Sequence, residues 1–216
     1  VVGWDPGIEP LDLYDWDKAT GVLAAGPLWW EPGTASGYHA LTQGYLEGEV
    51  VRRITGRSIG TFFREEVAEP LGADFHIGLP APEDHRYAPI VPPGRTLDDV
   101  PGADPGSLPV RALRSCPVNG SEPNTREWRA AEIPAAGGIG NARAVGRIHS
   151  ALACGGTVDG VRLLSAEGVD RIFSLAVIDV DRGLTVSYAM NRMADALMGD
   201  FRGALLVFAA YQALAD

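Results

Sequence analysis

The chain has 216 residues, 46% hydrophobic and 21% charged, which is typical of a folded domain and not of a disordered tail. Its formal net charge of −10 disfavours nucleic acid as a partner, because an acidic surface repels phosphate backbones. No stretch reaches the roughly 18 apolar residues that a membrane-spanning helix needs, so we expect no membrane span.

Residues 1–37 are rich in aromatic residues, proline and glycine, and we expect them to form an ordered loop. One short helix is expected within this loop, at 15–25. The clearest helix is predicted over 38–55, because apolar side chains recur there at the helical period and form one face. The stripe at every fourth position consists of Leu46, Val50 and Ile54, with Leu41 and Tyr45 beside it.

Glycine and proline divide the next part of the chain. Gly56 is expected to end the first long helix, and a second helix over 58–69 should stop at Pro70. Short strands are predicted at 74–79 and 86–91, where apolar and aromatic residues lie between turn residues.

The remaining elements begin after a long segment rich in proline, glycine and serine. We expect a surface loop over 92–123, then helices over 141–153 and 165–173, each capped by its first residue. A hairpin is predicted at 175–190 and a terminal helix at 203–214. Because helices and antiparallel strands are segregated, the predicted class is α+β.

Two sequence patterns suggest chemistry but are better explained by structure. Residues 56–60 match G-x-S-x-G, yet a helix precedes them where a hydrolase would need a strand. We therefore expect Ser58 to cap the second helix and not to act as a nucleophile. The glycines at 137–140 match no phosphate-binding motif and are expected to form a turn before Asn141.

No metal or cofactor site is predicted. The four histidines and two cysteines never occur in pairs at ligand-like spacing. Cys116 and Cys154 are expected to be isolated buried or loop thiols.

Several motifs occur in order and at matching spacing between residues 31 and 72. They are Pro32-Gly33, Tyr38-His39-Ala40, Thr55-Gly56-Arg57-Ser58, Phe62 or Phe63, and Pro70-Leu71-Gly72. This segment resembles the serine β-lactamase-related, penicillin-binding-protein-like family, which includes class C β-lactamases, D-alanyl-D-alanine carboxypeptidases and carboxylesterases. Residues 133–156, 175–191 and 203–214 also resemble that family. The resemblance implies a β-lactamase/transpeptidase-like fold, in which an antiparallel sheet is flanked by helices, and a single domain over 1–216.

The resemblance also implies a mechanism. In the family, the serine of an S-x-x-K motif attacks an acyl carbon, and the acyl-enzyme is then hydrolysed by water. Tyr38 matches the tyrosine that takes part in proton transfer beside that serine, so we expect Tyr38 to begin a helix and face a cleft. Ala40 replaces the asparagine of Y-x-N, which favours a carboxylesterase over a β-lactamase.

The sequence departs from the family in two places. Residues 1–216 contain no S-x-x-K, and Lys18 is the single lysine. The third family motif should come just before Leu175 but is absent. We therefore expect the nucleophile region and a segment near 174 to be missing, and the chain alone to be inactive.

The leading hypothesis is a carboxylesterase with a small-molecule ester or amide substrate. The alternatives are a non-catalytic homologue that binds or has a structural role, a D-alanyl-D-alanine carboxypeptidase or β-lactamase, and an unrelated G-x-S-x-G hydrolase. Compartment and oligomeric state are left open.

Gly44 and Gly48 stand four residues apart on the predicted long helix. Each glycine costs about 1 kcal/mol relative to alanine in a helix. We expect another backbone to approach closely there, either the missing segment or another helical element. The alternative is a weak surface helix.

Overall fold

The computed structural model describes residues 3–173, except 6, 33, 35, 36, 38, 93, 95–103 and 105. Within this part, the chain forms two compact units, each with its own packing. The first unit comprises 3–62 and 77–139, and the second comprises 63–76 and 140–173. The expected hairpin at 175–190 and helix at 203–214 lie outside the described residues. The single domain over 1–216 stays a prediction.

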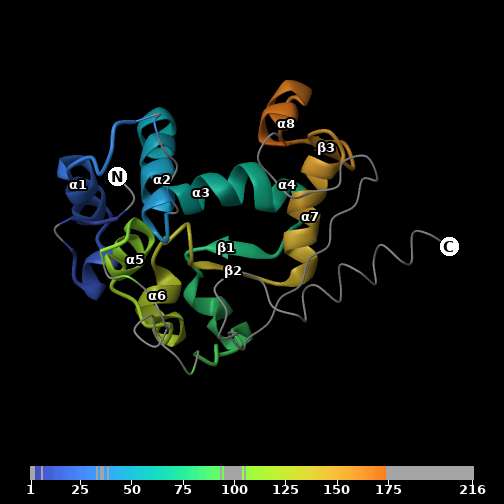
Figure 1. Ribbon diagram of the computed structural model, residues 1–216. Coiled ribbons are helices and arrows are strands. Elements are labelled where there is room, and N and C mark those ends of the chain that lie inside the picture. The colour runs from blue at the N-terminus through green and yellow to red at the C-terminus, as the bar shows by residue number, and fades with distance from the viewer. Residues whose placement is uncertain are drawn as a thin grey trace. The chain divides into compact units, whose positions relative to one another are not determined.

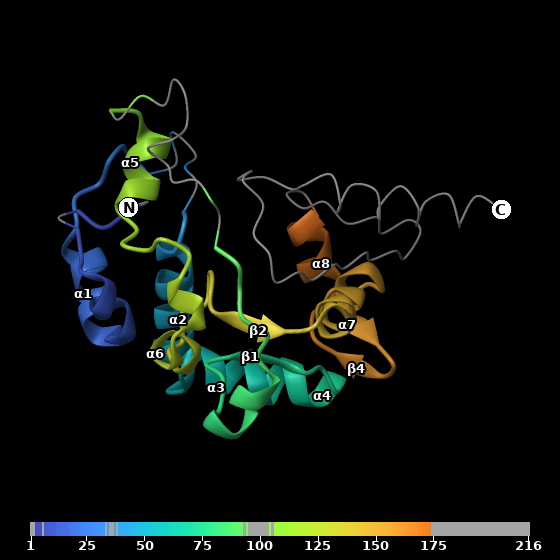
Figure 2. The ribbon, with the colours of Figure 1, turned by 90° about the horizontal axis from the view of Figure 1, so that it is seen from below.

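Helices α1 (Trp16–Ala25) and α2 (Thr42–Thr55) lie side by side in the first unit (Figures 1 and 2). The short 3-10 helix η1 (Pro10–Tyr14) leads into α1. Asp15 caps α1 by accepting a hydrogen bond from Lys18 N at 3.0 Å, as is common for aspartate at a helix start. The predicted helix at 15–25 is confirmed.

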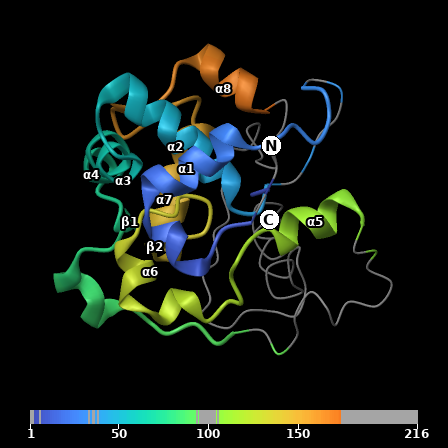
Figure 3. The same ribbon diagram turned by 90° about the vertical axis from the view of Figure 1, so that its left-hand side faces the viewer.

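Helix α2 begins later than the sequence predicts. It starts at Thr42 and not at 38, whereas its end at Thr55 is as expected. Gly56 adopts φ 71° and donates its N–H to Arg52 O, so its role as the helix terminator is confirmed. Figure 3 shows α1 running across α2 in the first unit.

The buried face of α2 differs from the predicted apolar stripe. Val50 and Ile54 are 57% and 78% exposed, so that part of the prediction is wrong. The buried residues of the helix are Thr42, Gly44, Tyr45 and Gly48. The helix therefore packs through small residues and one tyrosine, and the two glycines let neighbouring parts of the chain approach it closely.

Both glycines of α2 are in close contact with other parts of the chain, but the predicted approach of a backbone is confirmed at Gly44 and is wrong at Gly48. A Cβ atom at Gly44 would lie 2.5 Å from the backbone nitrogen of Ala135. A Cβ atom at Gly48 would lie 2.5 Å from Cη2 of Trp16. The neighbour is thus a backbone at Gly44 and an indole ring at Gly48, and both belong to the described chain.

Tyr45 lies at the centre of the core of the first unit. Its ring is fully buried and packs against Trp4 and Trp16, with ring centroids 5.6 Å and 5.2 Å away. Its hydroxyl donates to Leu13 O at 2.7 Å, which satisfies the buried polar group. Burial raises the pKa of Tyr45 above its ordinary value, with a smaller contribution from Tyr14.

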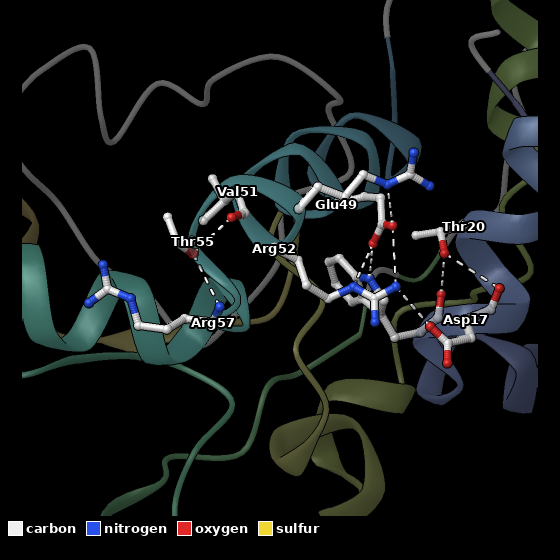
Figure 4. A network of polar contacts seen from close by, with 9 residues as sticks. Asp17, Thr20, Glu49, Val51, Arg52, Thr55 and Arg57 are labelled. Atoms are coloured by element: carbon white, nitrogen blue, oxygen red, sulfur yellow. Dashed lines mark hydrogen bonds and ion pairs between the residues drawn. The ribbon is translucent and has the colours of Figure 1, made fainter.

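A carboxylate connects α1 and α2 beside this core (Figure 4). Glu49 accepts hydrogen bonds from Arg52 Nε at 2.7 Å, Trp16 Nε1 at 2.9 Å and Arg53 Nε at 2.8 Å. Arg52 also donates to Asp17 of α1 at 3.0 Å. These donors, Arg52 first, lower the pKa of Glu49 to about 2, so the carboxylate stays ionised in the folded state.

The remaining part of the first unit corrects two predictions. No strand spans 86–91, because Arg86 ends the 3-10 helix η3 (Ala81–Arg86) and the Asn124 side chain hydrogen-bonds both N and O of Ile90. The loop predicted at 92–123 contains helix α5 (Leu108–Arg114), which buries Val110 and Ala112. Two further short elements are η5 (Glu122–Asn124) and α6 (Arg126–Ala130).

The second predicted helix does not stop at Pro70. It runs through α3 (Ile59–Phe63), the π-helical turn η2 (Arg64–Ala68) and α4 (Glu69–Leu71). Glu69 donates its N–H to Arg64 O, five residues earlier, and this wider turn accommodates the proline that lacks an N–H. Gly72, at φ 59°, ends the helix instead.

Capped helices dominate the second unit (Figure 2). Helix α7 (Ala142–Ala153) is capped by Asn141, and helix α8 (Ala166–Phe173) by Ser165, as predicted. Between them, β3 (Thr157–Val158) and β4 (Val161–Arg162) form an antiparallel hairpin.

A second two-stranded sheet lies within the described residues. Strand β1 (Phe75–Ile77) confirms the strand predicted at 74–79, although it is shorter. It pairs with β2 (Gly138–Gly140). The turn predicted at 137–140 is therefore wrong, since three of those residues form a strand. No helix in the described part of the chain is both long and apolar enough to span a membrane.

We predict that Gly44→Ala destabilises the intact protein by about 1–3 kcal/mol, because the added methyl group must displace the Ala135 backbone. Gly21→Ala is the matched control, since Gly21 lies within α1 and a Cβ atom there meets nothing within 4 Å. The control should be stabilised by about 0.5–1 kcal/mol. Urea unfolding measures both, and equal effects would contradict the close contact at Gly44.

The Glu49 network predicts a specific dependence of stability on pH. Because the pKa of Glu49 falls from 4.5 to about 2 on folding, its contribution is present above pH 4.5 and is lost as the pH falls towards 2. Glu49→Gln should cost about 1 kcal/mol at pH 7 and flatten this acid-dependent loss. Glu47→Gln, at an exposed carboxylate of the same helix, is the control. Identical pH profiles for the two variants would contradict the prediction.

Candidate active site

Tyr38, the residue that the sequence assigns to catalysis, lies outside the described residues. Its position facing a cleft therefore stays a prediction. The expectation that Tyr38 begins α2 is wrong, because the helix starts four residues later, at Thr42, after Leu41 as N-cap. The described residues that follow Tyr38 define how the chain enters this helix.

The segment from His39 to Thr42 is held in place by burial and one hydrogen bond. Leu41 is 4% exposed and the Thr42 side chain is fully buried. His39 Nδ1 lies 2.8 Å from Thr42 Oγ1. Burial lowers the pKa of His39, which favours the neutral imidazole, although Glu47 acts in the opposite direction. The segment 39–42 thus forms a turn that is held in place by burial and by this contact.

Cys116 lies close to this segment but is a poor nucleophile. Its side chain packs against the core of the first unit, and its thiol contacts the Leu41 backbone. Burial raises the pKa of the Cys116 thiol, so the reactive thiolate is disfavoured. Cys154 is also a free thiol and is exposed.

Ser58 has the capping role that the sequence predicts. Its hydroxyl accepts a hydrogen bond from Thr61 N at 3.3 Å and donates to Glu132 Oε1 at 2.7 Å. The second oxygen of Glu132 accepts from Gly60 N at 2.9 Å. One serine and one distant carboxylate thus accept hydrogen bonds from backbone N–H groups at the start of α3, which have no partner within the helix. Sequence reasoning missed Glu132, because no local pattern connects it to a helix 72 residues away.

The other histidines form no catalytic or metal-binding group within the described residues. His85 and His149 each donate to a carbonyl oxygen of their own helical turn. His76 Nε2 lies 3.4 Å from Asp74 Oδ1. No cluster of three or more His, Cys, Asp or Glu side chains in the described ranges could hold a metal ion.

A surface pocket of about 640 Å³ lies in the first unit, away from Tyr38 in sequence. Its walls are residues 13–17, Arg52, Ser58 and 130–132. Arg52 stands ten positions after the start of α2, which corresponds to about 15 Å along a helix. The Arg52, Ser58 and Glu132 side chains in the wall already hydrogen-bond other protein groups.

The comparisons with known proteins agree with this architecture. Residues 2–173 match the Beta-lactamase family model. The chain is 38% identical over 149 residues to "Esterase/beta-lactamase LipL" of Mycobacterium tuberculosis, and the match covers 61% of this chain and 33% of that protein. The chain thus spans about one third of this curated relative.

Two solved structures resemble most of the chain. A family VIII carboxylesterase superimposes with a TM-score of 0.86 and 36% identity, covering 98% of this chain and 67% of the other. A penicillin-binding protein homologue from Caulobacter crescentus gives a TM-score of 0.83 and 32% identity, with the same coverages. The expected α+β, β-lactamase/transpeptidase-like fold is confirmed. The chain therefore belongs to the beta-lactamase family and resembles its carboxylesterase branch.

Proposed function

We propose that this chain is part of a carboxylesterase that hydrolyses small-molecule esters through an acyl-enzyme on a serine. Tyr38 transfers protons beside that serine, and the serine and its lysine are supplied by sequence outside residues 1–216. The single observation that carries this proposal is the likeness to a family VIII carboxylesterase, which extends over 98% of the chain.

Ala40 supports an ester over an amide substrate. It stands two residues after Tyr38, where β-lactamases of the family carry an asparagine. A methyl group offers neither the N–H donors nor the carbonyl acceptor of an asparagine amide. A substrate amide therefore loses hydrogen-bonding partners at this position, whereas a simple ester needs fewer of them.

Lys18, the single lysine of the sequence, is unsuited to activating a serine. Its ammonium group lies 2.6 Å from the Asp12 carboxylate. That hydrogen bond raises the pKa of Lys18, so the neutral amine that could accept a proton is disfavoured. The family mechanism therefore requires a lysine outside residues 1–216.

A second candidate is a non-catalytic member of the family that acts as a binding module. The observation that favours it is the absence of S-x-x-K from residues 1–216. The two candidates differ in one measurable property, since the binding module hydrolyses no ester even when the full-length protein is assayed.

We predict that Tyr38→Phe lowers kcat/KM of the full-length protein by about 100-fold or more for p-nitrophenyl butyrate, because general acid–base groups contribute about 10²–10⁴-fold. Tyr87→Phe is the matched control, since Tyr87 stacks under Arg129 in the first unit. This variant should keep the kcat/KM of the wild-type protein. Full activity in Tyr38→Phe would exclude the proposed role of Tyr38. A wild-type protein without hydrolysis would favour the binding module.

We further predict that Ser58→Ala leaves this hydrolysis nearly unchanged and lowers stability by about 0.5–2 kcal/mol through the lost cap. Ser150→Ala is the control, because its hydroxyl donates to a carbonyl of its own helix and caps nothing. Activity and thermal unfolding are measured together. Loss of hydrolysis in a stably folded Ser58→Ala protein would identify Ser58 as the nucleophile and contradict the proposal.

A further inference from the structure

One face of α2 presents apolar side chains to solvent. Val50 and Ile54, about one helical turn apart, are 57% and 78% exposed. Leu46, one turn before Val50, is half-buried. We call these three residues the outer stripe of α2. Apolar side chains at every fourth position of a helix are the pattern by which helices pack against a partner.

Charged side chains flank the outer stripe symmetrically about Val50. Glu47 stands three residues before Val50 and Arg53 three residues after it, so each lies about 4.5 Å from Val50 along the helix axis. Glu47 is exposed, and the Arg53 side chain is 75% exposed. Their hydrogen bonds, to Gln43 at 2.7 Å and to Glu49 at 2.8 Å, stay within α2. Both charges are therefore accessible to a partner at the same surface.

This symmetry makes the outer stripe complementary to a second copy of itself. When two α2 helices pack antiparallel about a twofold axis beside Val50, positions equally far before and after Val50 come level with each other. Leu46 of one copy then meets Ile54 of the second copy, and Glu47 lies level with Arg53 of the second copy. Parallel packing would instead bring each charge level with the same residue of the other copy, and like charges repel.

We propose that the outer stripe of α2 is a self-association surface, through which two copies of the protein pair antiparallel about Val50. Valine at the centre is small enough for the two helix axes to approach to the roughly 8–10 Å typical of packed helices. Three apolar side chains per copy bury less than the roughly 800 Å² per partner of a stable interface. The net charge of −10 also opposes association. The dimer is therefore weak and depends on protein concentration.

Sedimentation velocity of the full-length protein, over a wide range of concentration, tests the surface. The wild-type protein should shift from monomer to dimer as its concentration rises. Ile54→Asp should stay monomeric, because pairing would bury the new charge among apolar side chains. Leu11→Asp is the matched control and should dimerise as the wild type does, since Leu11 is 73% exposed but lies in η1.

Charge reversal tests the antiparallel register. Glu47→Arg and Arg53→Glu each bring like charges level in a dimer of that variant, so each should raise the Kd of the dimer about tenfold or more. An equimolar mixture of the two variants should dimerise again, because each mixed dimer contains two pairs of opposite charges. High salt should weaken this rescue, since it screens exposed charges.

Three results would overturn the inference. The first is a wild-type protein that stays monomeric at every concentration, and the second is a mixture that dimerises no better than either charge variant alone. The third concerns Val50→Cys in a Cys154→Ser background, which removes the exposed native thiol. This protein should form a disulfide-linked dimer when it is oxidised with diamide. A thiol at position 50 that a maleimide cannot reach in the monomer would show that another segment of the same polypeptide covers the outer stripe.

Discussion

The close packing against the glycine face of α2 is the constraint on which the first unit depends. Gly44 and Gly48 lie one turn apart and flank Tyr45 on the buried side of the helix. Without side chains at these two positions, the Ala135 backbone and the Trp16 ring can reach the helix surface. Each glycine weakens the isolated helix, and the buried contacts offset that cost. The same packing holds the start of α2, four residues after Tyr38, to which the proposed chemistry is assigned.

Local signals made much of the fold predictable. Helices α7 and α8 follow from capping residues within their own segments, and the structure has Asn141 and Ser165 in those roles. The sequence predicts the wrong face of α2 to be buried, because hydrophobic periodicity assumes that large apolar residues face the core. Which face is buried was decided by close approach at Gly44 and Gly48, and that approach depends on residues distant in sequence.

The candidate site was predictable to a smaller extent. The matching motifs mostly fix helix ends: Gly56 ends α2, and Ser58 caps α3. The family is therefore recognisable in a sequence without S-x-x-K, because these roles in folding do not depend on the nucleophile. Glu132 could not be predicted, since it reaches Ser58 and Gly60 only through tertiary packing. The proposed chemistry depends on Tyr38 and on residues outside 1–216.

The location of the acylated serine tests this account most directly. The full-length protein is treated with a fluorophosphonate, which reacts with activated serines, and peptide mass spectrometry then locates the adduct. The account predicts one adduct on a serine outside residues 1–216, followed three positions later by a lysine. An adduct on Ser58, or on any other serine of this chain, would contradict it.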